Sequence, residues 1–180
     1  MHASVCDILT DLVQNAIEAG ATQVEMEVST TPTMIRARIQ DNGKGMNADT
    51  LAKARDPFFS ESGKHDRRRV GLGIPLLMQT ASAVGGTADI HSEPGKGTTV
   101  EFAFDATHLD TPPLGDLPAT VLGLMAFNGA YDLTVKRVTP SDGYTVSRSD
   151  LTDALGSLEE VDNLVLARAY LRSQEDNLNP

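Results

Sequence analysis

The sequence predicts an α+β sandwich, in which helices pack on a sheet. Segments 24–28 and 35–39 alternate apolar and polar residues on either side of a short turn, which is typical of a hairpin. Segments 87–92 and 98–104 flank a second turn at residues 93–97. Helical patterns stand before the first hairpin and between the two hairpins. This order predicts one sheet with helices layered on it.

The first helix is predicted by apolar residues that recur every three or four positions from Val5 to Ile17. Its other face carries Asp7, Asp11, Asn15 and Glu18. Asn is a poor residue for a helix interior, because its short amide competes for backbone hydrogen bonds. Asp11 and Asn15 lie one turn apart on the same face, close enough to act on one ligand. A solvated polar face with an incidental Asn is the alternative.

Two further helices are predicted in the middle of the first region. A short helix is expected from about Asn47 to Arg55. A longer one is expected over 74–84, where Pro75 fits the first turn and two glycines follow the end. The polar segment 60–69 between them is predicted to be a loop.

Composition restricts the class of protein. The chain has 180 residues, 40% of them hydrophobic, which suffices for one substantial core and a second small one. It has no apolar run long enough to span a membrane, and its N-terminus lacks the basic region of a signal peptide. The single cysteine, Cys6, excludes an internal disulfide and favours a reducing cytoplasm. The net charge of −10 opposes nonspecific binding to nucleic acid.

Charge is distributed unevenly, which indicates two regions. Residues 1–104 carry 13 acidic and 10 basic side chains, whereas residues 105–180 carry 12 and 5. We therefore predict a domain over 1–105, a linker rich in Pro and Asp over 106–117, and a small α+β extension over 118–180.

The extension is predicted to contain three antiparallel strands and a helix. Segments 118–127, 131–138 and 144–149 have the composition of strands, and Asn128 with Gly129 is a strong signal for a tight turn. A capping box formed by Ser157 and Glu160 is expected to begin the helix. The extension is either a separate small domain or an addition to the first sheet. Its acidity would suit docking on a basic protein partner, and a solvated surface is the alternative.

Glycine-rich segments stand at two points where backbone could meet a ligand. Asp41 to Gly45, DNGKG, follow a predicted strand directly, so Asp41 ends that strand and the glycines let the backbone approach a ligand. An ordinary turn is the alternative. Gly71 and Gly73 precede the long helix, whose first amides and positive end could meet an anion. The cations of segment 64–69 lie next to this helix start, although a solvated charge run is the simpler interpretation.

Five segments, taken in order, resemble the N, G1, F, G2 and G3 boxes of the GHKL ATPase superfamily: DLVQNAIEAGA (11–21), DNGKGM (41–46), DPFF (56–59), GLGI (71–74) and EPGKGTTVEF (93–102). That superfamily includes histidine kinases, gyrase, mismatch-repair ATPases and heat-shock chaperones. The resemblance covers about residues 4–105. It implies the Bergerat fold, a two-layer α/β sandwich that binds ATP together with Mg²⁺.

The resemblance also implies roles for particular residues. Asn15 matches the residue that holds Mg²⁺ through its amide oxygen, and oxygen is the ligand atom that this hard cation prefers. Asp41 matches the carboxylate that accepts a hydrogen bond from the adenine amino group, and Thr98 matches the threonine that assists it. The other positions with an implied ATP-binding role are Gly43, Gly45, Met46, Lys64, Arg67, Gly71, Leu72 and Gly73. Gly71 to Gly73 match a hinge, and a cation of segment 64–69 would meet the γ-phosphate.

The reaction is open between three hypotheses. The first is a kinase-like protein, related to histidine kinases and anti-sigma kinases, that transfers phosphate to a separate protein partner. None of the four histidines stands in the context of a phosphoacceptor. The second is a hydrolytic switch in which Asp11 is the general base, although Asp is one methylene shorter than the Glu usual there. The third is a regulatory subunit that senses ATP without using it. A homodimer is compatible with all three.

Overall fold

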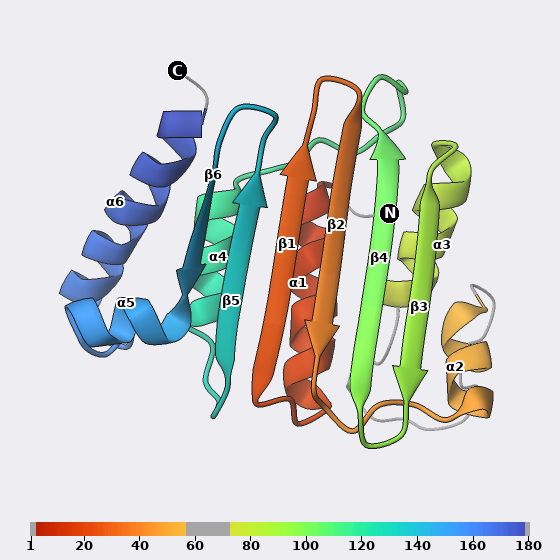
Figure 1. The fold of residues 1–180 in the computed structure, drawn as a ribbon, viewed down its shortest axis with the longest axis horizontal. Coiled ribbons are helices and arrows are strands. Elements are labelled where there is room, and N and C mark those ends of the chain that lie inside the picture. The colour runs from red at the N-terminus through yellow and green to blue at the C-terminus, as the bar shows by residue number, and fades with distance from the viewer. Residues whose placement is uncertain (1–2, 57–72, 179–180) are drawn as a thin grey trace.

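The computed structural model describes residues 3–56 and 73–178 (Figure 1). In chain order its elements are α1 (Val5–Glu18), β1 (Gln23–Thr30), β2 (Met34–Asp41), α2 (Ala48–Arg55), α3 (Gly73–Ala83), β3 (Thr87–Glu93), β4 (Gly97–Asp105), α4 (Leu117–Met125), β5 (Asp132–Val138), β6 (Gly143–Ser147), α5 (Arg148–Leu155) and α6 (Val161–Leu178). Both hairpins and all three helices predicted for the first region are therefore confirmed. The predicted loop at 60–69 lies outside the described residues.

The strands form one six-stranded sheet in the order β3-β4-β2-β1-β5-β6. Neighbouring strands are antiparallel except β1 and β5, which run parallel (Figure 1). The predicted α+β sandwich is confirmed, and its sheet is mixed. Strand β1, the first strand in the sequence, lies in the interior of the sheet, between β2 and the C-terminal strand β5.

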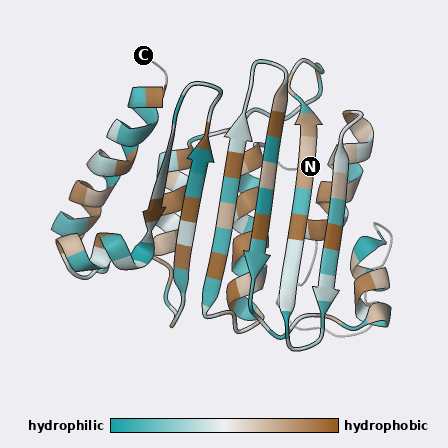
Figure 2. Ribbon diagram, in the orientation of Figure 1, coloured by the Kyte–Doolittle hydropathy of each residue, from teal (hydrophilic) through white to brown (hydrophobic). Residues whose placement is uncertain are grey.

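The core lies between one face of the sheet and the helices behind it in Figure 1. Along β1, Val24, Met26 and Val28 are buried and face α1, whereas Glu25 and Glu27 are exposed. Figure 2 shows the same alternation of hydropathy along the neighbouring strands. Helix α1 buries seven residues on its inner face: Val5, Cys6, Ile8, Leu9, Leu12, Val13 and Ala16. The polar face of this helix is consequently available for other contacts.

The segment between β4 and α4 returns to the start of α1. The N–H groups of Val5 and Cys6 donate to the carbonyl oxygens of Pro113 at 2.8 Å and Leu114 at 2.9 Å. Ser4 caps α1 in a capping box with Asp7, so two of the unsatisfied groups at the helix start gain partners. The segment predicted as a linker thus packs against the first helix.

Residues 117–125 form helix α4, which corrects the strand predicted over 118–127. Buried residues recur there at helical spacing: Leu117, Val121, Leu124 and Met125. Pro118 occupies the first turn, and the Asp116 side chain accepts from the N–H of Ala119 at 3.0 Å. A short, continuously apolar segment fits a buried helix and a buried strand equally well by periodicity, which is why the sequence pattern misled.

The C-terminal region contains two strands, β5 and β6, in place of the three predicted. Strand β5 pairs with β1 and thereby joins the first sheet. Strand β6 ends at Ser147, whose side chain caps α5, a helix that the sequence analysis did not anticipate. The predicted capping box is wrong in detail: α6 begins at Val161, and the Ser157 hydroxyl accepts instead from the N–H of Glu159 at 3.2 Å.

A buried ion pair connects helix α6 to strand β5 of the sheet. Arg137 Nε donates to Glu175 Oε1 at 3.1 Å, and the two side chains are 3% and 16% exposed. The Tyr144 hydroxyl donates to the same carboxylate at 3.2 Å. Burial and the nearby Glu175 charge raise the pKa of Tyr144, so this donor stays protonated.

Within residues 3–56 and 73–178, no helix is both long and apolar enough to cross a membrane.

Candidate functional site

Polar side chains replace the core at one end of the sheet. On the helix-covered face, the paired residues Ile90, Val100 and Ile39 form an apolar row across β3, β4 and β2. The next row, at the carboxyl end of β2, consists of Ser92, Thr98 and Asp41. Side chains directly opposite on paired strands are neighbours. These three side chains therefore form one polar row that borders the core.

Asp41 ends β2 with its carboxylate partly buried. Its Oδ1 accepts from the N–H of Gly43 at 2.8 Å. Burial raises the pKa of Asp41, and hydrogen bonds from the N–H groups of Gly43 and Thr98 oppose that shift without cancelling it. The neighbouring Asn42 has another role, because its Oδ1 accepts from the backbone of Thr22 at 2.9 Å and holds the start of β1. Asp41 thus combines a desolvated acceptor with a fixed orientation.

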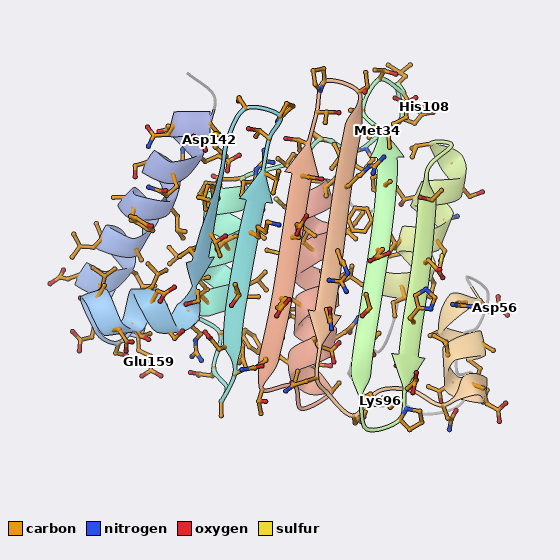
Figure 3. All side chains as sticks on the ribbon, in the orientation of Figure 1. Met34, Asp56, Lys96, His108, Asp142 and Glu159 are labelled. Atoms are coloured by element: carbon orange, nitrogen blue, oxygen red, sulfur yellow. The ribbon has the colours of Figure 1, made fainter. Side chains whose placement is uncertain are left out.

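The loop after Asp41 is held on both sides through its backbone. The N–H of Lys44 donates to the carbonyl oxygen of Ala19 at 3.0 Å, at the end of α1, and the carbonyl oxygen of Lys44 accepts from the N–H of Gly95 at 2.8 Å. Gly95 and Lys96 belong to the β3–β4 turn, where Figure 3 labels Lys96. The loop therefore joins the end of α1 to the tip of the second hairpin.

Glycine is required twice in this loop. Gly45 has φ +63°, and a Cβ there would lie 1.9 Å from the carbonyl oxygen of Glu93. Gly43 is buried, and a Cβ there would lie 2.9 Å from Asp41 Oδ1 and 3.1 Å from Ala19 Cβ. Side chains at either position would displace the backbone that the loop places beside Asp41.

Helix α3 begins against the polar face of α1. A Cβ built on Gly73 would lie 2.9 Å from Asp11 Cβ, 3.5 Å from Asp11 Oδ2 and 3.6 Å from Asn15 Nδ2. Asp11 and Asn15 are both partly buried. Asn15 stands one turn before Ala19, the residue that contacts the loop after Asp41. The polar face of α1 therefore connects the start of α3 to the Asp41 loop.

The structure brings together most of the residues predicted from the sequence. Asp11, Asn15 and Gly73 form one end of the site, and Asp41, Gly43, Gly45, Met46 and Thr98 form the other. Lys64, Arg67, Gly71 and Leu72 lie outside the described residues. Sequence reasoning missed Ser92, which contacts both Met46 and Thr98. Ser92 could have been recognised by its position in the predicted strand. It occupies an inward-facing position at the strand end, where a residue of the apolar core would be expected.

Within the described part of the chain, no cluster of three or more His, Cys, Asp or Glu side chains could hold a metal ion. The Asn15 amide and the Asp11 carboxylate supply oxygen donors on one helix face, a donor set suited to a hard cation. A cation bound there would need further oxygen ligands from another molecule.

Comparison with known proteins places this fold and site. A family model described as "Histidine kinase-, DNA gyrase B-, and HSP90-like ATPase" matches residues 3–108. The chain is 31% identical over 117 residues to the non-motile and phage-resistance protein of Caulobacter vibrioides, covering 61% of this chain and 14% of that protein. It is 28% identical over 97 residues to the sensor histidine kinase YxdK of Bacillus subtilis, covering 52% and 30%.

Among solved structures, the chain is similar to the N-terminal domain of a DNA repair protein. The TM-score is 0.50 at 16% identity, and the match covers 86% of this chain and 57% of that one. This likeness concerns the fold alone. The matched region is less than a third of the length of either curated relative.

Strands β1 to β4, helices α1 to α3 and the polar strand end all lie in the segment that matches the family model. The chain belongs to the family of histidine kinase-, DNA gyrase B- and HSP90-like ATPases.

Proposed function

We propose that the chain binds ATP with Mg²⁺ at the site between Asp41 and Asn15, and transfers phosphate to a separate protein partner in a reducing cytoplasm. The observation that best supports nucleotide binding is Asp41, a partly buried carboxylate fixed by the Gly43 N–H at the end of β2. The chain belongs to an ATPase family, which supports ATP as the ligand that this carboxylate would contact.

Asp41 would select adenine by charge and hydrogen-bond polarity. Its carboxylate accepts, so it suits the exocyclic amino group of adenine and opposes a carbonyl oxygen at the same position in guanine. A partly desolvated acceptor left facing another acceptor is costly, so this discrimination exceeds that of a solvated contact. A Cβ at Gly43 would lie 2.9 Å from Asp41 Oδ1, so glycine there keeps the carboxylate clear, whereas glycine at position 45 lets the loop pack against the backbone of Glu93. Met46 and Thr98 lie at the same end of the site.

The triphosphate would lie toward α1 and the start of α3. Asn15 would offer its amide oxygen to Mg²⁺, with the other ligands coming from phosphate and water, and bound Mg²⁺ would neutralise phosphate charge. The donor set fits this assignment, because a hard cation prefers oxygen ligands and both Asn15 and Asp11 supply them on one helix face. Gly73, the first residue of α3, lies against Asp11 and Asn15, and a helix start favours an anion. We assign the remaining phosphate contacts to Lys64, Arg67, Gly71 and Leu72.

Phosphate transfer to a partner is the reaction that the histidine kinase relatives favour. The chain would act as a monomer or a homodimer, and its acidic C-terminal region would dock a basic partner. An excess of protein mixed with γ-labelled ATP and Mg²⁺, followed over time, tests this function. The label is expected to stay on bound ATP until the partner is added and then to move to the partner. Failure to bind ATP more tightly than GTP would overturn the proposal at its first step.

A hydrolytic switch is the second candidate, and the position of Asp11 favours it. The Asp11 carboxylate lies beside Gly73, at the helix start assigned to the phosphates, where a general base for water would stand. In this case the labelling experiment yields prompt free phosphate, and Asp11→Asn abolishes it while ATP still binds. Phosphate release that continues unchanged in Asp11→Asn contradicts this candidate. An ATP sensor without chemistry would retain bound ATP even when its partner is present.

A further inference from the structure

Ser92 makes three hydrogen-bonding contacts around one hydroxyl group. Its Oγ lies 2.8 Å from the backbone nitrogen of Met46, 3.0 Å from the carbonyl oxygen of Gly97 and 2.9 Å from Thr98 Oγ1. Ser92 is partly buried and Gly97 is buried, so these groups have little access to water. The contacts link β3, the Asp41 loop and β4 at one point.

Only one choice of hydrogen-bond donors and acceptors satisfies all three contacts of the Ser92 hydroxyl. A serine hydroxyl has one proton to donate and two lone pairs to accept with. The Met46 N–H can only donate, so it occupies one lone pair of Ser92. The Gly97 carbonyl oxygen can only accept, so it takes the Ser92 proton. Thr98 must then donate its own proton to the second lone pair of Ser92.

This choice of donors and acceptors determines the orientation of the Thr98 hydroxyl group. Its proton points to Ser92, and its lone pairs are left for the other side. Asp41 is the residue paired with Thr98 across β2 and β4, so the two side chains are neighbours on the helix-covered face. Without Ser92, the Thr98 proton would be free to turn toward the Asp41 carboxylate and occupy an acceptor site there.

We propose that Ser92 is a positioning residue for base recognition, which holds the Thr98 hydroxyl as an acceptor and so keeps the Asp41 carboxylate open to the amino group of adenine. This inference rests on the proposed function, because it assumes that Asp41 receives adenine. Ser92 itself contacts protein groups and acts through Thr98.

Affinity for two nucleotides tests the proposal: ATP and purine riboside triphosphate, which lacks the exocyclic amino group. In Ser92→Ala, ATP affinity is expected to fall about tenfold, the effect of one compromised hydrogen bond to a charged group, while the amino-free nucleotide changes little. Ser92→Thr, which keeps a hydroxyl, is expected to restore most of the preference. Thr87→Ala, an exposed residue on the same strand, serves as the matched control and should change neither affinity.

The outcomes separate this inference from the proposed function. If the unaltered protein binds both nucleotides equally, Asp41 does not read the amino group and the proposed base recognition fails. If it prefers ATP and Ser92→Ala weakens both nucleotides equally, Ser92 has only a structural role and the inference is overturned. Should Ser92→Ala unfold, Ser92→Cys replaces it, because a thiol is only a weak donor and acceptor and should lower ATP affinity in the same direction. Where the variants fold, Thr98→Val removes the competing proton, so Ser92→Ala added to it should cause no further loss of preference, and a further loss contradicts the proposal.

Discussion

Gly73 and Asp11 are in contact so close that residue 73 has room for no side chain. A Cβ there would lie 2.9 Å from Asp11 Cβ. Gly73→Ala should therefore push α3 away from α1 and lower the free energy of unfolding by roughly 1–3 kcal/mol, the usual cost of overpacking. It should also weaken ATP binding, because the helix start moves away from Asn15. Urea unfolding and nucleotide titration measure the two effects.

Gly123→Ala is the matched control for that change. Gly123 lies in α4, and nothing would come within 4 Å of a Cβ there. Alanine is the better helix former, so this variant should be more stable by about 0.5–1 kcal/mol. The same change in the free energy of unfolding in both variants would show that the contact with Asp11 is unimportant.

Asp41→Asn should separate stability from binding. Burial raises the pKa of Asp41, so its ionised form opposes folding at pH values above that pKa. The variant keeps an oxygen for the Gly43 N–H and carries no charge, so the nucleotide-free variant should melt at a higher temperature than the original protein near pH 7. ATP affinity should fall sharply, since the amide can turn a donor toward the adenine amino group.

The pH dependence of that difference checks its cause. As pH falls through the raised pKa of Asp41 toward the ordinary value of 3.8, the carboxylate takes up a proton in the folded state and the disadvantage disappears. The melting temperatures of the two proteins should therefore converge in acid. ATP binding by the original protein should weaken over the same range. A constant gap in melting temperature at all pH values would refute this explanation.

Gly45→Ala should be the most damaging change in the Asp41 loop. The new Cβ would lie 1.9 Å from the carbonyl oxygen of Glu93, so the backbone of the loop or the β3–β4 turn must move. Gly95→Ala is the control, because Gly95 also has positive φ, at +76°, yet nothing lies within 4 Å of a Cβ there. The control should lose about 1 kcal/mol from the left-handed conformation alone. If the free energy of unfolding fell equally in both variants, the close contact between residue 45 and Glu93 would not affect stability.

Breaking the Arg137–Glu175 pair should detach α6 from the sheet. Glu175→Ala leaves a guanidinium that is 3% exposed without its carboxylate, and the free energy of unfolding should fall by about 3–5 kcal/mol. The control is Glu27→Ala, which breaks the exposed pair with Lys136 and should cost less than about 1 kcal/mol. Nucleotide affinity of the folded proteins should be unchanged. Urea unfolding that gives equal losses for both variants would argue against a buried anchor.

The sequence predicted the first region well because its elements obey strong local rules. The alternation of β1 and β2 and the periodicity of α1 each bury one face, so pattern and structure coincide. The contact between Asp11 and Gly73 could not be predicted, because it depends on how two helices separated by more than fifty residues meet on the sheet. Ser92 was missed for a similar reason, since its partners lie on two other segments, the loop after Asp41 and strand β4.

The C-terminal region was harder to predict because its environment, more than its local pattern, decides its structure. Residues 117–125 are apolar on nearly every side and became a helix because they fill the space beside α1 and α6. Strand β5 alternates as predicted, but nothing in its sequence specifies a parallel neighbour. The roles assigned to Asn15 and Asp41 toward ATP remain predictions, supported by geometry and family membership.

The pairing of β1 with β5 also sets the order in which the molecule can be completed. Strand β1 leaves the ribosome well before its second neighbour, which is about a hundred residues further on, at Asp132–Val138. Until that segment emerges, one edge of β1 lacks its native partner. Such long-range closure slows folding and leaves a strand edge open to other chains. The emergence of β5 is therefore the step that protects the middle of the sheet.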